Sequence, residues 1–157
     1  MCKYHDNQHE HERLADQNIE SIQAIFDQKE IPTTFLELED GTENPELVAQ
    51  LLECEPEQIM IASLFQTLND QSPILVLTNS TKHASEKLVQ TIIGERVVLQ
   101  EYNVKPLGYQ KPVETLIDAD LVEYPELWAS AGTPNIIFSI EGDELQYLTG
   151  GKLINIK

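Results

Sequence analysis

The chain has 157 residues, of which 27 are acidic and 10 are basic, so its formal net charge is −17 with histidine neutral. Broad affinity for nucleic acids comes from lysine and arginine side chains that neutralise phosphates, so this charge excludes DNA as a partner and limits any contact with RNA to a local one. The length favours one domain, large enough to bury a core without disulfides or metal ions.

The first residues of the chain are polar and charged, with hardly any apolar side chain before residue 14. Such a segment cannot bury enough surface to order itself. We therefore predict a flexible, acidic and histidine-rich tail over residues 1–14 and a single folded domain over residues 15–157. A flexible tail gives no fixed ligand geometry, so we expect no metal and no cofactor at its histidines, which are His5, His9 and His11.

The cysteines and apolar runs indicate the compartment. Cys2 and Cys54 are the two cysteines of the chain, and they make no disulfide framework. No apolar segment follows the polar start as it would in a signal peptide, and the longest apolar runs are far shorter than a membrane helix requires. The sequence therefore predicts a cytoplasmic protein without a membrane partner.

Helix and strand patterns begin after the tail. From about Asp16, apolar residues recur at helical spacing, and a helix is predicted that ends before Pro32. Thr33–Leu38 alternates as a short strand does. Asn44 followed by proline is typical of a helix start, and an apolar stripe after it predicts a second helix.

The middle of the chain predicts a hairpin, a helix and a further strand. Two apolar runs, Gln58–Leu68 and Ser72–Thr78, are separated by a polar turn and indicate a hairpin of two buried strands. Residues 85–93 have helical spacing and are closed by Gly94, and residues 96–100 return as a strand.

The last third of the chain also contains both strand and helix patterns. Tyr102–Pro112 contains two prolines and a glycine and is predicted to be a loop. We then predict a strand with a turn over residues 113–121, a strand over 136–140, a short helix over 143–148 and a last strand over 153–156. The whole pattern indicates a single domain of the mixed α+β class.

Two aspartates, Asp118 and Asp120, are candidates for acid–base chemistry. Alternate residues of a strand point to opposite faces, so one of the two is expected to be solvated, which argues against a carboxylate pair. Asp118 is then either a hydrogen-bonding residue for a loop or ligand, or an ordinary aspartate at the end of a strand.

Residues 130–135 (SAGTPN) form the densest cluster of small, turn-forming residues. Gly132 permits close backbone approach, and Thr133 and Asn135 offer side-chain hydrogen bonds. The segment is either a loop that holds a small polar ligand or a tight connection between Trp128 and the next strand.

Several motifs in the second half of the chain occur together in one known family. They are Pro106 and Gly108 in a Pro-x-Gly loop, Ile117, Asp118 and Leu121 in IDxxL, Trp128 followed by AGTPN, and LTGG at Leu148–Gly151. Weaker, collinear matches extend upstream, so the likeness covers nearly the whole chain after the tail. On these motifs the sequence resembles the YbaK/ProXp-type aminoacyl-tRNA editing family, also called the prolyl-tRNA synthetase-associated domain.

The resemblance implies an α+β domain with a curved, largely antiparallel central sheet flanked by helices. It also implies a trans-acting deacylase that hydrolyses the ester of mischarged tRNA, most often tRNA for proline, without a metal. The implied partners are the acceptor end of an aminoacyl-tRNA and an aminoacyl-tRNA synthetase. In that family, backbone N–H groups of a glycine-containing loop hold the aminoacyl carbonyl and a lysine stabilises the substrate, which places fixed donors at a developing oxyanion.

Two positions depart from the family pattern. The family lysine expected before Ser63 is Ala62, and the glycine expected four residues before Pro106 is Tyr102. A bulky residue adopts positive φ only with strain, so we expect a remodelled loop or a blocked pocket. Two functions therefore stay open: an editing deacylase, and a catalytically impaired relative that binds a ligand or a protein.

Basic residues complete the candidate site. Lys82 and His83 lie where relatives carry a basic pair near the entrance for the acceptor end; alternatively, they are solvated residues before a helix. Lys105 and Lys111 flank the Pro-x-Gly loop, where RNA contact is expected. The candidate substrate-binding residues are Pro106, Gly108, Asp118, Gly132, Thr133, Asn135, Lys82 and His83, and no catalytic residue is assigned because Ala62 occupies the lysine position.

Overall fold

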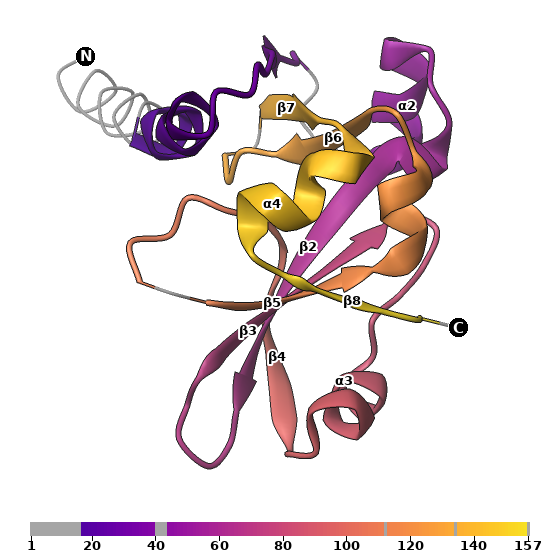
Figure 1. The fold of residues 1–157 in the computed structure, drawn as a ribbon. Helices are drawn as coiled ribbons and strands as arrows, with labels where there is room; N and C mark the ends of the chain where they lie inside the picture. The colour runs from indigo at the N-terminus through magenta and orange to yellow at the C-terminus, as the bar shows by residue number, and fades with distance from the viewer. Residues whose placement is uncertain (1–16, 40–43, 112, 134, 157) are drawn as a thin grey trace, which may run out of the picture.

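The computed structural model describes residues 17–39, 44–111, 113–133 and 135–156. The tail predicted over residues 1–14, including its three histidines and Cys2, lies outside the described residues. Within the described ranges, eight strands form one unclosed sheet in the order β1-β7-β6-β2-β3-β5-β8, and β4 pairs with β2 outside this path (Figure 1). None of the helices in those ranges has the length and hydropathy of a membrane span.

The strands have the following bounds: β1 Phe35–Glu37, β2 Ile59–Thr67, β3 Pro73–Asn79, β4 Val97–Val104, β5 Glu114–Asp118, β6 Leu127–Ser130, β7 Ile136–Ile140 and β8 Lys152–Ile154. The helices are an N-terminal helix described over residues 17–28, α2 Pro45–Leu52, α3 Glu86–Ile93 and α4 Leu145–Thr149. Short 3-10 turns lie at η1 Pro56–Gln58, η2 Ala119–Glu123 and η3 Gly142–Glu144. The predicted mixed α+β class is confirmed.

Local chemistry accounts for the helix ends. The side chain of Asn44 accepts a hydrogen bond from the Leu47 backbone N–H at 3.2 Å and begins α2. Ser85 begins α3 in the same way by accepting from Leu88 N–H at 3.1 Å, and Gly94 closes it in the left-handed region. The predicted starts of both helices are thus confirmed.

The sheet is mixed, with more antiparallel than parallel pairs. The predicted hairpin is confirmed, because β2 and β3 pair antiparallel from Met60–Asn79 to Gln66–Pro73. β2–β4, β6–β7 and β1–β7 are also antiparallel, whereas β2–β6, β3–β5 and β5–β8 are parallel. β2 therefore pairs with three other strands. β3 lies along one edge of β2; along the other edge, β6 pairs with the N-terminal part and β4 with the remainder.

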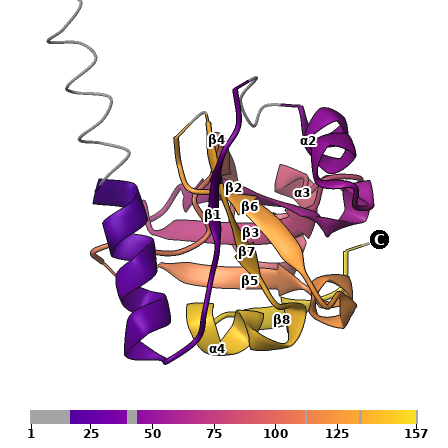
Figure 2. The same cartoon turned by 90° about the horizontal axis from the view of Figure 1, so that it is seen from above.

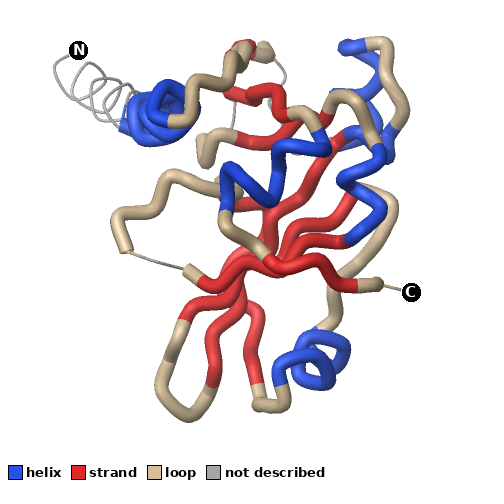
Figure 3. The backbone as a smooth tube through the Cα atoms, in the orientation of Figure 1, coloured by secondary structure: helices blue, strands red, loops and turns tan. Residues whose placement is uncertain are grey.

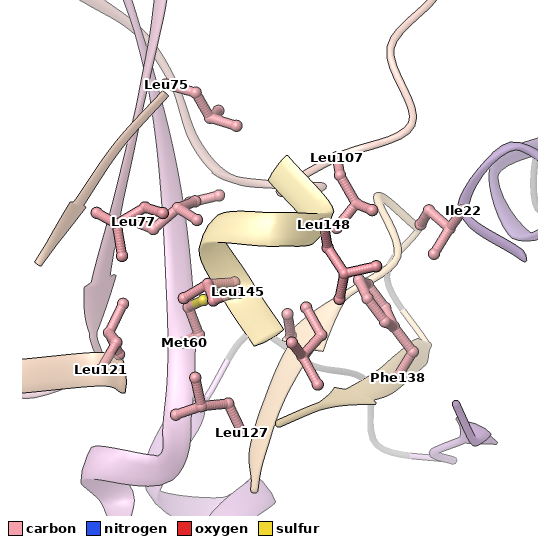
Figure 4. Packing of buried hydrophobic residues seen from close by; sticks show 14 of the residues in the cluster. Ile22, Met60, Leu75, Leu77, Leu107, Leu121, Leu127, Phe138, Leu145 and Leu148 are labelled. Carbon is pink, nitrogen blue, oxygen red and sulfur yellow. The ribbon is translucent and has the colours of Figure 1, made fainter. Parts of the chain in front are cut away.

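Helices cover both faces of this sheet (Figure 2). The N-terminal helix and α4 pack on the face that carries Met60, Ala62 and Leu77, and they form the largest buried cluster with it. Figure 4 shows Leu145 and Leu148 of α4 at the centre of this cluster. α2 and α3 pack on the opposite face in two smaller clusters. Alternation along β2 explains the division, because successive side chains point to opposite faces.

Two predictions about the strands were wrong. The loop predicted from Tyr102 begins later, because β4 continues to Val104. No strand was predicted over residues 127–130, which form the buried strand β6 between β2 and β7. In both cases pairing with a neighbouring strand determines the backbone, and pairing partners far along the chain leave no local pattern.

Candidate functional site

An open cleft of about 910 Å³ lies between the N-terminal helix and the loop that follows β4. Figure 3 shows this loop leaving the sheet beside that helix. The volume of the cleft falls in the range of small-ligand pockets, about 300–1,000 Å³. The lining residues are Gln17, Asn18, Glu20 and Ser21 of the helix, Leu64 and Pro73 of the sheet, and Lys105, Gly108, Tyr109, Gln110, Lys111 and Val113 of the loop. The cleft thus brings together the two basic residues predicted for RNA contact, Lys105 and Lys111.

Lys105 is half-buried in the wall of this cleft. Its Nζ donates hydrogen bonds to Asn18 Oδ1 at 3.2 Å and to the carbonyl of Gly108 at 3.1 Å. The ammonium also lies 5.0 Å from the centroid of the Tyr109 ring. Each of these partners is uncharged, and burial lowers the pKa of the Lys105 ammonium below its ordinary value.

A hydrogen bond from Tyr109 closes the loop that follows β4. The tyrosine hydroxyl donates a hydrogen bond to the Lys105 carbonyl at 2.7 Å. Burial, with repulsion from Glu101 as a smaller cause, raises the pKa of Tyr109 to about 12. At neutral pH a neutral phenol therefore holds the loop in shape.

Two of the predicted glycines hold the walls of the cleft together. Gly108 has a φ of +93°, and a Cβ placed on it would lie 3.1 Å from both Ile22 Cγ1 and Ser21 Oγ. Gly132 has a φ of +88°, and its Cβ would lie 3.1 Å from Asn18 Nδ2 and 3.3 Å from Lys105 Cβ. Both loops approach the N-terminal helix closely because these positions carry no side chain.

The segment 130–135 is the connection between the antiparallel strands β6 and β7. The Ala131 N–H donates to the Ile136 carbonyl at 2.9 Å, and the Gly132 N–H donates to Ser130 Oγ at 3.1 Å. Of the two alternatives for this segment, the structure shows the tight connection, and through Gly132 the same turn reaches Asn18 and Lys105 at the edge of the cleft. Asn135 is exposed, the hydroxyl oxygen of Thr133 is buried without a hydrogen-bond partner among the described residues, and Pro134 lies outside them.

The two positions that depart from the family pattern have a clear structural basis. Ala62 is 2% exposed and belongs to the largest buried cluster, so it does not line the cleft. Tyr102 is 56% exposed and pairs with Ser63 in the sheet. Tyr102 does not itself take a positive φ, because the neighbouring Asn103 does so, at +57°, at an irregularity in the β2–β4 pairing. Tyr102 is absent from the cleft lining, so it does not block it.

Lys82 and Asp118 contact each other away from the cleft. Lys82 Nζ lies 2.9 Å from Oδ2 of the buried Asp118 and 2.5 Å from Oδ2 of the exposed Asp120, and it donates to the Ile156 carbonyl at 3.3 Å. The hydrogen bond to Asp120 first, and then the contact with Asp118, raise the pKa of the Lys82 ammonium above its usual value.

This ion cluster lies outside the cleft, because Lys82, Asp118 and Asp120 are not among the residues that line it. Pro73 and Val113 line the cleft at the starts of the parallel strands β3 and β5, whereas Asp118 ends β5 and Lys82 follows β3. Asp118 also accepts a hydrogen bond from Asp120 N–H at 3.3 Å, as an ordinary aspartate at a strand end does.

Of the two remaining predicted site residues, one lies next to the cleft and the other does not. Pro106 is buried beside the cleft-lining Lys105, and His83 is exposed just before the start of α3. The helix residues Asn18 and Ser21 and the loop residue Tyr109 were missed as candidates. Asn18 and Ser21 lie three residues apart on the predicted helix, which places them on one face, but their spacing does not identify what that face meets.

Comparison with known proteins identifies solved structures that share this fold at low sequence identity. No family model and no curated protein matches this chain. The crystal structure of a candidate trans-editing enzyme for prolyl tRNA synthetase is 23% identical, with a TM-score of 0.78 over 89% of this chain and 96% of that chain. A structure from work on grafting epitope backbones onto scaffold proteins is 22% identical, with a TM-score of 0.77 over 89% and 96% of the two chains.

A third similar structure, of a hypothetical protein, is 15% identical with a TM-score of 0.77 over 87% of this chain and 98% of that chain. These identities establish a shared fold. They confirm the architecture that the resemblance to the YbaK/ProXp-type family implies, including its mixed and mostly antiparallel sheet.

Proposed function

We propose that this chain is a trans-acting aminoacyl-tRNA deacylase that hydrolyses the ester of a mischarged tRNA. The cleft beside the N-terminal helix would hold the acceptor end of the tRNA, and the contact with RNA would be local because the chain carries a net charge of −17. The shared fold with a candidate editing enzyme supports this function. The observation that carries it is the half-buried Lys105, held with uncharged partners at the point where two glycine loops meet one helix.

The chemistry requires a polarised carbonyl and a leaving ribose hydroxyl. Water adds to the ester carbonyl, the tetrahedral oxyanion collapses, and the C–O bond to the ribose breaks with transfer of a proton to the departing oxygen. A preorganised cation or N–H donor at the oxyanion lowers this barrier by several kcal/mol, about 3 for a single donor. Lys105 and the loop at Gly108 supply the polar groups that line this part of the cleft.

The test is hydrolysis of a panel of aminoacyl-tRNAs by the purified protein. Alanyl- and cysteinyl-tRNA for proline are the mischarged members, and correctly charged prolyl-tRNA is the negative member. We expect turnover of at least one mischarged tRNA and preservation of the correct one, since a hydrolytic second step is needed where binding discriminates small amino acids poorly.

A matched pair of glycine variants connects activity to the cleft. Gly132→Ala and Gly94→Ala both place a Cβ at a positive φ, so both carry the same kind of backbone strain. Only the Cβ at Gly132 meets Asn18 and Lys105, because nothing lies within 4 Å of a Cβ at Gly94. Gly132→Ala is expected to lower kcat/KM at least tenfold while Gly94→Ala retains it; equal effects would contradict a site in this cleft.

A second function, a ligand- or protein-binding module without catalysis, is favoured by Ala62. Its side chain is packed in the core, so the strand position expected to supply a lysine contributes no polar group to the cleft. This function predicts that a non-hydrolysable aminoacyl-adenosine binds to the protein while no member of the panel is turned over. Turnover of a mischarged tRNA would exclude it.

A further inference from the structure

We propose that Lys105 is an anion-binding residue and that it takes a phosphate group of the nucleotide that enters the cleft. This inference rests on the proposed function for the identity of the ligand. It concerns one side chain and one chemical group, and the experiment below separates it from the question of catalysis.

The surroundings of the Lys105 ammonium are the first step. An ammonium has three N–H donors, and Asn18 Oδ1 and the Gly108 carbonyl accept two of them. The Tyr109 ring lies on a further side at 5.0 Å. All three partners are uncharged, so the charge of Lys105 is neutralised by none of them.

The lack of a counter-ion is the second step. Across the part of the chain that the structure describes, the ion pairs join Lys82 to Asp118 and Asp120, and none involves Lys105. Glu20 lines the same cleft without reaching ion-pair distance of Lys105. A half-buried cation without a carboxylate attracts an anion more strongly than an exposed one, because the lower dielectric strengthens their interaction.

The rigid support of Lys105 is the third step. The Asn18 hydrogen bond ties it to the N-terminal helix, the Gly108 hydrogen bond ties it to its own loop, and Gly132 of the β6–β7 connection lies against its Cβ. Three separate segments therefore fix the position of one ammonium. A fixed cation binds a ligand group with a smaller loss of side-chain entropy than a free surface lysine.

The chemistry of the substrate identifies the anion. In an aminoacyl ester the carboxyl group of the amino acid is already bonded to the ribose, so it carries no negative charge. The α-amino group is neutral or positive. The anions that remain at the acceptor end are the phosphodiesters, and lysine is a common point-charge ligand for phosphate. A phosphate that reaches Lys105 would fix the terminal nucleotide relative to the rest of the cleft.

The test compares adenosine with adenosine 5′-monophosphate as probes, with binding measured by calorimetry or by NMR shifts. Wild-type protein is expected to bind the monophosphate at least tenfold more tightly than adenosine. In Lys105→Met this preference should fall to less than twofold, and Lys105→Arg should keep part of it because the charge remains. Lys87→Met, which removes an exposed charge from α3, should keep the full preference.

Thermal unfolding of each variant confirms that the comparison is made on folded protein. A wild-type protein without preference for the monophosphate, or a Lys105→Met variant that retains it, would overturn the inference. Loss of the preference in both Lys105→Met and Lys87→Met would also overturn it, because net charge and not the cleft would then be responsible. Phosphate binding through Lys105 without turnover of any aminoacyl-tRNA would leave the inference standing and contradict the proposed deacylase.

Discussion

At the scale of single residues, two half-buried lysines in the described part of the chain, Lys82 and Lys105, have opposite surroundings. Lys82 lies between two carboxylates, and Lys105 lies among uncharged groups. The first arrangement neutralises charge inside the fold, and the second leaves a charge available to a ligand. Sequence alone did not separate them, because both lysines occur in polar loops and the groups that face them come from distant parts of the chain.

The Lys82 cluster predicts a specific loss of stability. Lys82→Met leaves the buried Asp118 carboxylate without its cation, which is expected to lower the free energy of unfolding by about 2–3 kcal/mol. Asp120→Ala is the matched control, because Asp120 is exposed and an exposed ion pair contributes less than about 1 kcal/mol. Urea denaturation measures both. Neutralising the buried carboxylate by Asp118→Asn in the Lys82→Met background should restore part of the loss; equal stability of the three variants would refute the role of the cluster.

The raised pKa of Tyr109 predicts a distinct alkaline titration. Its pKa is about 12 in the folded protein against an ordinary value of 10.0. Because the folded value is the higher one, the contribution of Tyr109 to stability is complete below pH 10 and is lost as the pH rises towards about 12. Ultraviolet titration should show a late-ionising tyrosine that is absent in Tyr109→Phe; identical curves above pH 10 for folded wild type and variant would show that the phenol is not held neutral.

At the scale of elements, the N-terminal helix forms one wall of the cleft because it is anchored by buried side chains. Ile22 and Phe26 are both 0% exposed, and the Phe26 ring meets the edge of Phe138 with centroids 6.0 Å apart. Ile22 and Leu107, both labelled in Figure 4, belong to the largest buried cluster. The helix and the loop after β4 are thus tied together below the cleft by apolar contacts as well as by Lys105.

This anchoring gives a prediction for Phe26→Ala. Truncation of a buried phenylalanine is expected to cost about 3–5 kcal/mol, and it should loosen the helix before the sheet because the sheet holds its own hydrogen bonds. Hydrogen exchange should show faster exchange in residues 17–28 than in β2 and β3. Gln28→Ala at the exposed end of the same helix is the control, and uniform loss of protection in Phe26→Ala would contradict independent docking.

The sequence predicted the elements whose patterns are local. The helices begin at Asn44 and Ser85 as expected, and the hairpin of β2 and β3 follows from two apolar runs around a polar turn. The short strand β6 was missed because four buried residues leave no periodicity to recognise. The end of β4 was missed because pairing with β2 extends the strand to Val104, and that pairing leaves no local pattern in the sequence.

The candidate site was predicted in part for the same reason. Gly108 and Lys105 line one cleft and Gly132 lies against Lys105 at its edge, and loops that contain glycine and proline are visible in a sequence. Asn18 was not predicted, because its role depends on where a helix docks. Asp118 was predicted as a candidate on its motif, and the structure places it in an ion pair at the far end of β5.

At the scale of the whole molecule, the charge of −17 predicts how stability responds to salt. Like charges repel one another in the compact state, and salt screens this repulsion. We expect the unfolding temperature to rise by a few degrees between about 10 and 150 mM sodium chloride. A fall would show that local ion pairs such as the Lys82 cluster outweigh the repulsion, and Lys82→Met should then respond less than wild type.

The edge of β2 that β4 and β6 share also has a consequence for synthesis of the chain on the ribosome. β3 follows β2 directly, but β4 ends at Val104 and β6 lies at Leu127–Ser130, so one edge of β2 stays open while a long segment is still being made. An open apolar strand is a template for pairing with other chains. A nascent chain that pauses after residue 104 has covered that edge only where β4 pairs. Slow codons placed just before β6 should therefore lower the yield of native protein more than slow codons placed after β7.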